Sequence, residues 1–582
     1  MRQITLPAVL IVVVVLLAAR SARADDLEFK DRLLDVLVEK VPEILKSFDP
    51  QTGRFGSGIW ICQDQHPMYP LAVVYTTEGE GNRYHHDPAL LEVIIKSGDP
   101  LLENRDPQGQ WVFNKKDGSS WGKIFMPWTY SRWIRTFALV RDRMPPEARQ
   151  RWTDALTLGY TGISKRCLGS VHNIPTHHAM GLYVAGKTLD RPEWCQQAGE
   201  FMAKVIGTQS EGGYWSEGGG PVVAYDFVYV DALGTYYAAS GDERVLAALE
   251  KASAFHRHFT YPDGSNVETI DQRNPYHHGA AAGNVGFTFS AVGRAFLQNQ
   301  WSQLGIEKLD PDLIASLLVY GEEGPVEQTP PGEAKQVFML TEGGTDRAAT
   351  LRHGPWFICL SAYTTPIVKS RWIQDRQNFV SVYHDQAGLI LGGGNTKLQP
   401  AWSTFTVGDP ALLAHTPGDE SPDFLPKGGL YHVPSAAKLV LEPDPGLDLS
   451  YGPETCRIRV VIRDERTLEY VVEATAESDL PAAAHLTLLP HIGEPLETGG
   501  GEKVTLGEEP ISLSPEQVGG RILYGGCRLH VPAGASLHWP TLPHNPYRKD
   551  GRASPSEGRI EIRIPFDEQH REHRATVEIP ET

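Results

Sequence analysis

The chain has 582 residues, of which 41% are hydrophobic and 22% are charged, a composition typical of a globular protein with roughly two to four domains. Its formal net charge of −18 argues against nucleic acid as a partner, because a protein that neutralises phosphates needs a basic face. An acidic substrate is still compatible with this charge, because a local basic cleft can lie on an acidic protein.

The N-terminus has the pattern of an export signal. Met1 and Arg2 precede an apolar run over residues 6–19, and Ala22-Arg23-Ala24 supplies an A-x-A cleavage site. Because the run is short for a membrane span, we predict cleavage after Ala24 and an exported protein, periplasmic or secreted, with no membrane span after signal removal. An uncleaved anchor is the alternative.

Residues 25–320 are predicted to form a helical domain. Leu33, Leu34, Leu37 and Val41 recur at helical spacing, and Asp87-Pro88 has the form of a helix start. Roughly ten helices joined by loops of unequal length suit helical hairpins arranged in a ring, an α/α toroid or incomplete helical barrel, better than a four-helix bundle. The helices are expected at residues 33–45, 88–96, 126–143, 145–158, 176–185, 192–206, 223–239, 242–258, 278–300 and 311–320.

The composition changes near Gly321. Residues 321–336 are rich in Pro, Gly and Glu and are predicted to be a linker. Residues 337–582 alternate between apolar and polar, with frequent turn signals, which predicts a C-terminal antiparallel β-sandwich domain. Strands are expected at residues 356–362, 379–383, 388–391, 437–441, 457–463, 467–473, 484–489 and 559–565.

The stretch from Glu211 to Asp231 combines acids, glycines and aromatics just ahead of a helix-like segment. The glycines, Gly213 and the run 218–220, favour a loop that approaches another group closely. Tyr225 and Tyr229 are four residues apart and would share a helix face. The segment is typical of a binding cleft, and a plain helix connection with an aromatic core face is the alternative.

Two other segments carry residues that suit proton transfer or anion binding. Asn173 precedes a helix expected to begin near Pro175, where its amide and the free N–H groups of the helix could meet an anion, and His178 follows in the first turns. The polar loop 261–279 carries Arg273 and His277. The alternatives are a local cap for Asn173, exposed helix positions for the histidine and a solvated connection for the loop.

Aromatic residues are dense between Trp60 and Trp133. Sugar rings stack on exposed aromatic faces, so Trp121 and Trp128 are candidate substrate-binding residues, although core packing is the more common role of any single tryptophan. We expect no cofactor and no metal in the site, and leave a structural divalent metal open. The six cysteines form no C-x-x-C pair, and the chain has no Walker A, Rossmann or H-E-x-x-H motif.

The order of these motifs resembles that of the heparinase II/III-like polysaccharide lyases, and more loosely that of chondroitin and alginate lyases, over both halves of the chain. The resemblance rests on Asn173, the acidic Gly-rich stretch before Tyr225, and Pro262-Asp263-Gly264 after a helix. In the second half it rests on Asn378-Phe379 followed by two strand-like segments, Val382-Tyr383 and Gly388-Leu389-Ile390-Leu391. It implies an α/α toroid followed by an antiparallel β-sandwich.

The resemblance also implies a reaction and roles. A family member would cleave a uronate-containing polysaccharide or oligosaccharide by β-elimination, with Asn173 and Arg273 neutralising the carboxylate and Tyr225 as acid and base. The H-x-H-x-D motif of the family is reduced here to Asp375, so the second acid/base group would come from His178, His277 or His384. Glu217, Tyr229, Trp121, Trp128 and His277 would contact substrate.

Two other classes of function stay open. A glycoside hydrolase on the same toroid would use two carboxylates flanking the glycosidic bond, for which Glu211, Glu217, Asp226 and Asp263 are candidates. A carbohydrate-binding protein without catalytic activity is the third class, and the missing histidines favour it.

Overall fold

The computed structural model describes residues 26–116, 118–273, 276–327 and 335–581. The predicted signal peptide and part of the predicted linker lie outside these residues, and the predicted domain boundaries stay predictions. The chain divides into two compact units. The helical unit comprises Met1–Thr208, Phe227–Arg257 and Ala282–Thr329, and the β unit comprises Gln209–Asp226, His258–Ala281 and Pro330–Thr582.

Two helices of the first part of the chain begin where the sequence signals predict. The side chain of Asp87 accepts a hydrogen bond from the Ala89 N–H at 3.0 Å, and Asp310 accepts one from Asp312 at 2.8 Å. The described helices are α2 (Lys30–Lys46), α3 (Met68–Thr76), α4 (Pro88–Lys96), α5 (Asp99–Asn104), α6 (Pro127–Val140), α7 (Pro146–Arg166), α8 (Asn173–Thr188), α9 (Pro192–Gly207), α10 (Val223–Ser240), α11 (Leu246–His258), α12 (Ala291–Leu304) and α13 (Pro311–Tyr320).

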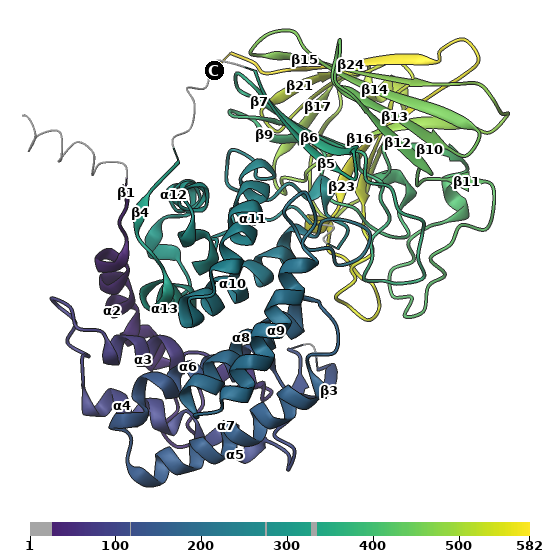
Figure 1. Cartoon of the computed structure of the whole chain (residues 1–582). Coiled ribbons are helices and arrows are strands. Elements are labelled where there is room, and N and C mark those ends of the chain that lie inside the picture. The colour runs from purple at the N-terminus through teal and green to yellow at the C-terminus, as the bar shows by residue number, and fades with distance from the viewer. Residues whose placement is uncertain (1–25, 117, 274–275, 328–334, 582) are drawn as a thin grey trace, which may run out of the picture. The chain divides into compact units, whose positions relative to one another are not determined.

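The helical unit closes into a ring of packed helices (Figure 1). Helix α3 packs on α6 and α6 on α8, and the Tyr183 ring of α8 lies 5.0 Å from the Tyr236 ring of α10. Phe227 of α10 lies 4.2 Å from His256 of α11, whose ring lies 6.1 Å from Phe296 of α12. Helix α13 then packs on α2 and α3. This circuit confirms the predicted α/α toroid.

One predicted helix begins later than expected. Residues 278–284 are irregular, a short 3-10 turn follows at Val285–Phe289, and the helix starts only at Ala291. The Ser290 side chain accepts a hydrogen bond from the Gly293 N–H at 3.0 Å and so caps the helix. Gly279, Gly283 and Gly286 disfavour a helix upstream of this cap.

The β unit contains three antiparallel sheets. The first is β5 (Gln336–Glu342), β6 (Thr345–His353), β7 (Trp356–Ser361), β8 (Val380–His384) and β9 (Gly388–Leu391). The second is β11 (Leu430–Tyr431), β10 (Phe405–Gly408), β16 (Ala482–Leu488), β23 (Arg559–Pro565), β22 (Ser536–Thr541) and β19 (Ile511–Leu513). The third is β12 (Ala436–Val440), β13 (Gly446–Tyr451), β14 (Glu454–Ile462), β15 (Thr467–Ala474), β24 (Glu572–Glu578), β21 (Cys527–His530), β20 (Arg521–Tyr524), β17 (Pro495–Thr498) and β18 (Lys503–Thr505).

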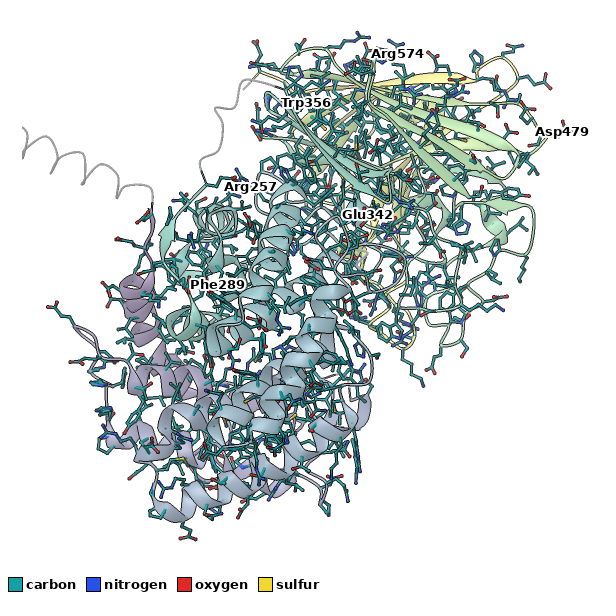
Figure 2. All side chains as sticks on the ribbon, viewed as in Figure 1. Arg257, Phe289, Glu342, Trp356, Asp479 and Arg574 are labelled. Carbon is teal, nitrogen blue, oxygen red and sulfur yellow. The ribbon has the colours of Figure 1, made fainter. Side chains whose placement is uncertain are left out.

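One buried apolar cluster joins the three sheets. It includes Trp356 of the first sheet, Phe405 of the second and Ile458 of the third. On the solvent side of the third sheet, Arg574 pairs with Glu469 at 2.7 Å (Arg574 and Trp356 are labelled in Figure 2). Apolar residues therefore face inward and charged residues outward, as a β-sandwich requires, and the eight predicted strands are all present.

The structure also shows the state of the cysteines and the length and polarity of the helices. All six cysteines are free thiols, so the described residues contain no disulfide. None of the described helices is both long enough and apolar enough to cross a bilayer.

Candidate functional site

The Gly-rich loop ahead of α10 packs tightly against other loops of the β unit. The Gly219 N–H donates to the Gln272 side chain at 2.8 Å, and Gln272 donates in turn to the Thr365 hydroxyl at 2.6 Å. A Cβ atom at Gly219 would lie 2.2 Å from Thr365, and one at Gly220 would lie 2.8 Å from Arg376. The glycines are needed for close approach, as predicted, and the groups approached belong to the protein itself.

A cluster of polar side chains follows this loop at the start of α10. Arg273 donates to the Tyr225 hydroxyl at 3.4 Å, and its guanidinium carbon lies 4.7 Å from the centre of the Tyr225 ring. On its other side, Arg273 lies 3.8 Å from the Glu217 carboxylate. The Asp271 side chain accepts the Arg273 backbone N–H at 2.7 Å and fixes the loop. Both Arg273 and Tyr225 are half-buried.

Tyr547 is a member of this cluster that sequence reasoning missed. Burial first, and then the nearby Tyr225, raise the pKa of the Tyr547 phenol, and the Tyr547 ring lies 5.9 Å from Trp372. The Asn545 side chain accepts the Tyr547 backbone N–H at 2.9 Å and holds the loop in place. We refer to Glu217, Tyr225, Arg273 and Tyr547 as the tyrosine cluster. No sequence periodicity connects Tyr547 to Tyr225, so only the fold could identify it.

His277 lies on the same loop as Arg273 and pairs with a buried acid. Its Nδ1 atom lies 3.1 Å from the Glu268 carboxylate, and its side chain is 19% exposed. Burial lowers the pKa of His277, but the Glu268 carboxylate outweighs it and raises that pKa above its ordinary value. His277 is therefore a histidine of the β unit that can carry a proton near neutral pH.

The two other predicted histidines are surrounded differently. The His384 Nε2 atom lies 3.0 Å from the Glu465 carbonyl, and its Nδ1 accepts the Gln386 N–H at 3.1 Å, so backbone groups engage both nitrogens. The structure does not bring His384 into the tyrosine cluster. His178, in the helical unit, is 4% exposed, and burial lowers its pKa to about 3, which keeps the imidazole neutral.

The helical unit contains a cleft of about 570 Å³ that includes both predicted substrate-binding tryptophans. Trp121, on the strand β3 (Ser120–Ile124), is 51% exposed, and Trp128 on α6 is half-buried. Among the described residues that line the cleft, none is acidic. We call this the tryptophan cleft; it is lined by Ile61, Gln63, His66, Phe113, Asn114, Lys115, Lys116, Trp121, Met126, Trp128 and Arg132.

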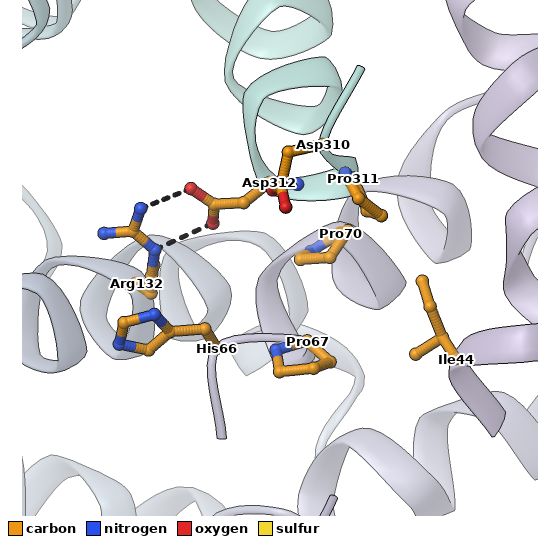
Figure 3. Close-up of a pocket in the computed structure, with 8 residues that line it drawn as sticks. All are labelled: Ile44, His66, Pro67, Pro70, Arg132, Asp310, Pro311 and Asp312. Carbon is orange, nitrogen blue, oxygen red and sulfur yellow. Dashed lines mark hydrogen bonds and ion pairs between the residues drawn. The ribbon is translucent and has the colours of Figure 1, made fainter. Parts of the chain in front are cut away.

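A second, smaller cavity of the helical unit shares two residues with the tryptophan cleft (Figure 3). His66 and Arg132 line both, and the close-up shows Arg132 facing Asp312. The Arg132 Nε donates to Asp312 at 2.8 Å, and a second guanidinium nitrogen pairs with the same carboxylate. Asp312 compensates the charge of Arg132, and Lys115 and Lys116 are two further basic residues that line the tryptophan cleft.

Asn173 is the first residue of α8 and is 6% exposed. The helix therefore begins two residues earlier than predicted, with His172 in the cap position. One turn later, the His177 ring lies 5.7 Å from Trp128, so the start of α8 lies close to the tryptophan cleft. Tyr229 is 1% exposed and belongs to the core of the helical unit, which argues against its predicted role in substrate contact.

The candidate carboxylates of the hydrolase alternative have structural partners. Asp226 is fully buried and accepts the Trp215 N–H at 2.8 Å. Asp263 accepts the Ser265 backbone and hydroxyl groups at 2.9 and 2.6 Å, and Glu211 accepts the Gly343 N–H at 2.8 Å. Glu217 is paired with Arg273.

Asp375, the remaining acid of the reduced motif, is buried in a charge-paired group. It lies 2.7 Å from the Lys397 ammonium and 3.3 Å from His432, and all three side chains are at most 1% exposed. Among the described residues, no group of three or more His, Cys, Asp or Glu side chains is placed to hold a metal ion.

Comparisons with known proteins identify similarity in structure. No family model and no curated protein matches the chain. The chain is similar to heparinase III, with 12% identity over 94% of this chain and 83% of that one and a TM-score of 0.48. It is similar to a chondroitin AC lyase of Streptomyces coelicolor A3, with 13% identity over 95% of this chain and 80% of that one and a TM-score of 0.48. It is also similar to a heparan sulfate lyase of Pedobacter heparinus, with 12% identity over 88% of this chain and 76% of that one and a TM-score of 0.45.

Proposed function

We propose that this protein is a lyase that cleaves a uronate-containing polysaccharide by β-elimination. The observation that carries the proposal is the contact between Arg273 and Tyr225, which joins a cation to a phenol at a half-buried position. The order of sequence motifs around Asn173, the Gly-rich loop and Tyr225 supports the same chemistry.

The reaction needs the two groups that Arg273 and Tyr225 provide. The proton at C5 of a uronate is weakly acidic while the neighbouring carboxylate keeps its charge. A guanidinium beside that carboxylate would stabilise the enolate-like state, as fixed donors do in oxyanion holes. Tyr225, in contact with Arg273, would act as the base that takes the C5 proton and as the acid that returns it to the departing O4.

Asn173 and His277 have supporting roles in this proposal. The amide of Asn173 would add a neutral donor for the carboxylate, and the buried first turn of α8 suits a rigid donor. His277, whose pKa the Glu268 carboxylate raises, would support the anionic substrate or relay a proton. His178 and His384 have no proposed part in proton transfer.

The tryptophan cleft is proposed to bind the acidic sugar chain. Trp121 and Trp128 offer flat apolar faces for pyranose rings, and Lys115 and Lys116 offer positive charge on a chain of net charge −18. This combination of aromatic faces and lysines suits a chain that carries carboxylate groups.

The test is an assay on a panel of uronate polysaccharides. Elimination leaves an unsaturated uronate that absorbs in the ultraviolet, whereas hydrolysis produces reducing ends without this absorbance. We expect new absorbance in step with new reducing ends. Reducing ends without absorbance would overturn the lyase in favour of a hydrolase, and binding without either product would favour a non-catalytic carbohydrate-binding protein.

We also infer that the protein is exported, because residues 1–24 have the order of a cleavable signal. Expression of the full chain in a bacterial host and N-terminal sequencing of the product outside the cytoplasm should give Asp25 as the first residue. Retention of residues 1–24 on a membrane-bound product would support the uncleaved anchor instead.

A further inference from the structure

We propose that Arg376 binds one small inorganic anion, of the size of chloride, through its Nε and Nη2 atoms. Arg376 belongs to the β unit, lies between β7 and β8 and is 1% exposed. The anion site shares no residue with the tyrosine cluster or the tryptophan cleft. Its test requires no polysaccharide, so the result does not depend on the proposed function.

One edge of the Arg376 guanidinium has no acceptor from the described residues. The Nη1 atom donates to the Ile270 carbonyl, whereas neither Nε nor Nη2 has a hydrogen-bond partner in the part of the chain that the structure describes. Nε and Nη2 carry the two parallel N–H bonds of the side-on edge, with which an arginine holds an anion at two points. The protein therefore engages the one nitrogen that is not needed for this two-point grip.

The charge of Arg376 is buried without a carboxylate on its hydrogen-bonding edge. The guanidinium carbon lies 5.3 Å from the centre of the Tyr363 ring, which gives a cation–π contact. Burial lowers the pKa of Arg376 to about 10, and the charge of Asp271 opposes this shift, so the side chain stays charged at neutral pH. A buried charge is costly unless it is compensated. A neutral water could satisfy the two N–H groups, but only an anion would also compensate the charge.

The surroundings of the two nitrogens limit the size of the anion. A Cβ atom at Gly220 would lie 2.8 Å from Nη2 and 3.0 Å from the Tyr363 ring, so glycine keeps this side of the guanidinium uncovered. Nε and Nη2 are both enclosed by the protein, so a carboxylate attached to a polysaccharide cannot reach them. A monatomic halide can be enclosed as the loops pack. Because Gly220 lies in the Gly-rich loop, the bound anion would stabilise the packing of this loop on the segment that carries Arg376.

The experiment uses bromide as a probe of the site and chloride as a stabilising ligand. Crystals of the natural protein grown in sodium bromide should show an anomalous bromine peak within about 3.5 Å of both Nε and Nη2 of Arg376. Thermal unfolding is then compared in sodium chloride and sodium gluconate at an equal ionic strength of about 0.1 M, because gluconate is too large for an enclosed site. The unfolding temperature should be about 2–5 °C higher in chloride, and Arg376→Gln should abolish this difference.

Arg459→Gln is the control, because Arg459 lies in the same unit and pairs with Asp448 at 2.8 Å. This variant should keep the difference between chloride and gluconate. An ordered water in place of a bromine peak, or equal unfolding temperatures of the natural protein in the two salts, would overturn the anion site. A difference that persists in Arg376→Gln would also overturn it. If Arg376→Gln does not fold, the bromine peak and the salt difference of the natural protein decide.

Discussion

The tyrosine cluster and the tryptophan cleft are assembled in opposite ways. The cluster takes Glu217, Tyr225, Arg273 and Tyr547 from distant segments. Arg273 contacts both Tyr225 and Glu217, and Tyr225 contributes to the raised pKa of Tyr547. The cleft takes its lining from residues 61–132, a short part of the chain, and leaves Trp121 half open to solvent. Fixed charged groups can stabilise a transition state, whereas exposed aromatic rings can bind a sugar chain. Substitutions in the tyrosine cluster should therefore lower kcat, and substitutions in the tryptophan cleft should raise KM.

The largest expected effect comes from Tyr225→Phe. Removal of the hydroxyl eliminates the proposed base and acid, and kcat should fall by about 10²- to 10⁴-fold with little change in KM. Initial rates of product absorbance across substrate concentrations measure both constants. Tyr431→Phe is the matched control, and a Tyr225→Phe protein with normal kcat would remove the cluster from the reaction.

Arg273→Lys should have the next largest effect. Lysine keeps the charge but lacks the planar guanidinium group that contacts both Tyr225 and Glu217, so kcat should fall by about 10- to 100-fold. Arg273→Ala should cost more, because the charge is lost as well. Equal activity of the lysine and alanine variants would show that the charge does not contribute, and natural activity in both would show that the guanidinium does not contribute either.

Trp121→Ala should affect binding rather than chemistry. Loss of the exposed indole should raise KM roughly three- to tenfold and leave kcat within about twofold. Val112→Ala is the control, because Val112 is also exposed on the hairpin β2 (Trp111–Asn114) and β3. A fall in kcat with unchanged KM would contradict the division of labour between cleft and cluster.

The lysines of the cleft should make binding sensitive to salt. Exposed charges are screened over a Debye length of about 8–10 Å, so KM should rise with ionic strength in the natural protein. The double variant Lys115→Gln, Lys116→Gln should show a flatter dependence and a KM roughly two- to fivefold higher at low salt. Lys123→Gln is the control, since Lys123 lies outside the lining of the cleft. An equal response there would assign the effect to total charge.

The smallest effect concerns stability. The folded-state pKa of His277 is raised, so its pair with Glu268 adds stability that is fully present below the unfolded pKa of about 6.5 and is lost as pH rises through the folded pKa. Thermal unfolding of His277→Gln should therefore differ most from the natural protein in mildly acidic buffer. A difference that grows toward alkaline pH would contradict this sign.

The sequence predicted the fold well because its signals are local. Helix starts such as Asp87-Pro88 and strands with alternating burial such as Glu454–Ile462 carry their own pattern. Short helices and strands such as α5, β17 and β19 were missed because too few residues repeat to define a period. The start of α12 was placed too early because the alanines before Ser290 favour a helix, whereas Gly279, Gly283 and Gly286 in the same segment disfavour one.

Some residues of the candidate sites were predicted correctly and others were not, because only some of them carry a local sequence signal. Trp121 and Trp128 are close in sequence and do line one cleft, and Arg273 does contact Tyr225. Tyr229 was singled out by its spacing from Tyr225, but helical spacing does not say which face is buried. Tyr547 depends on tertiary contact alone, which no local pattern records.

The most direct test is the origin of the oxygen in the new chain ends. Digestion of a uronate polysaccharide in water labelled with heavy oxygen, followed by mass spectrometry, distinguishes elimination from hydrolysis. The lyase account predicts unsaturated products without label, formed by the natural protein and lost in Tyr225→Phe. Saturated products that carry one labelled oxygen, formed equally by both proteins, would contradict it.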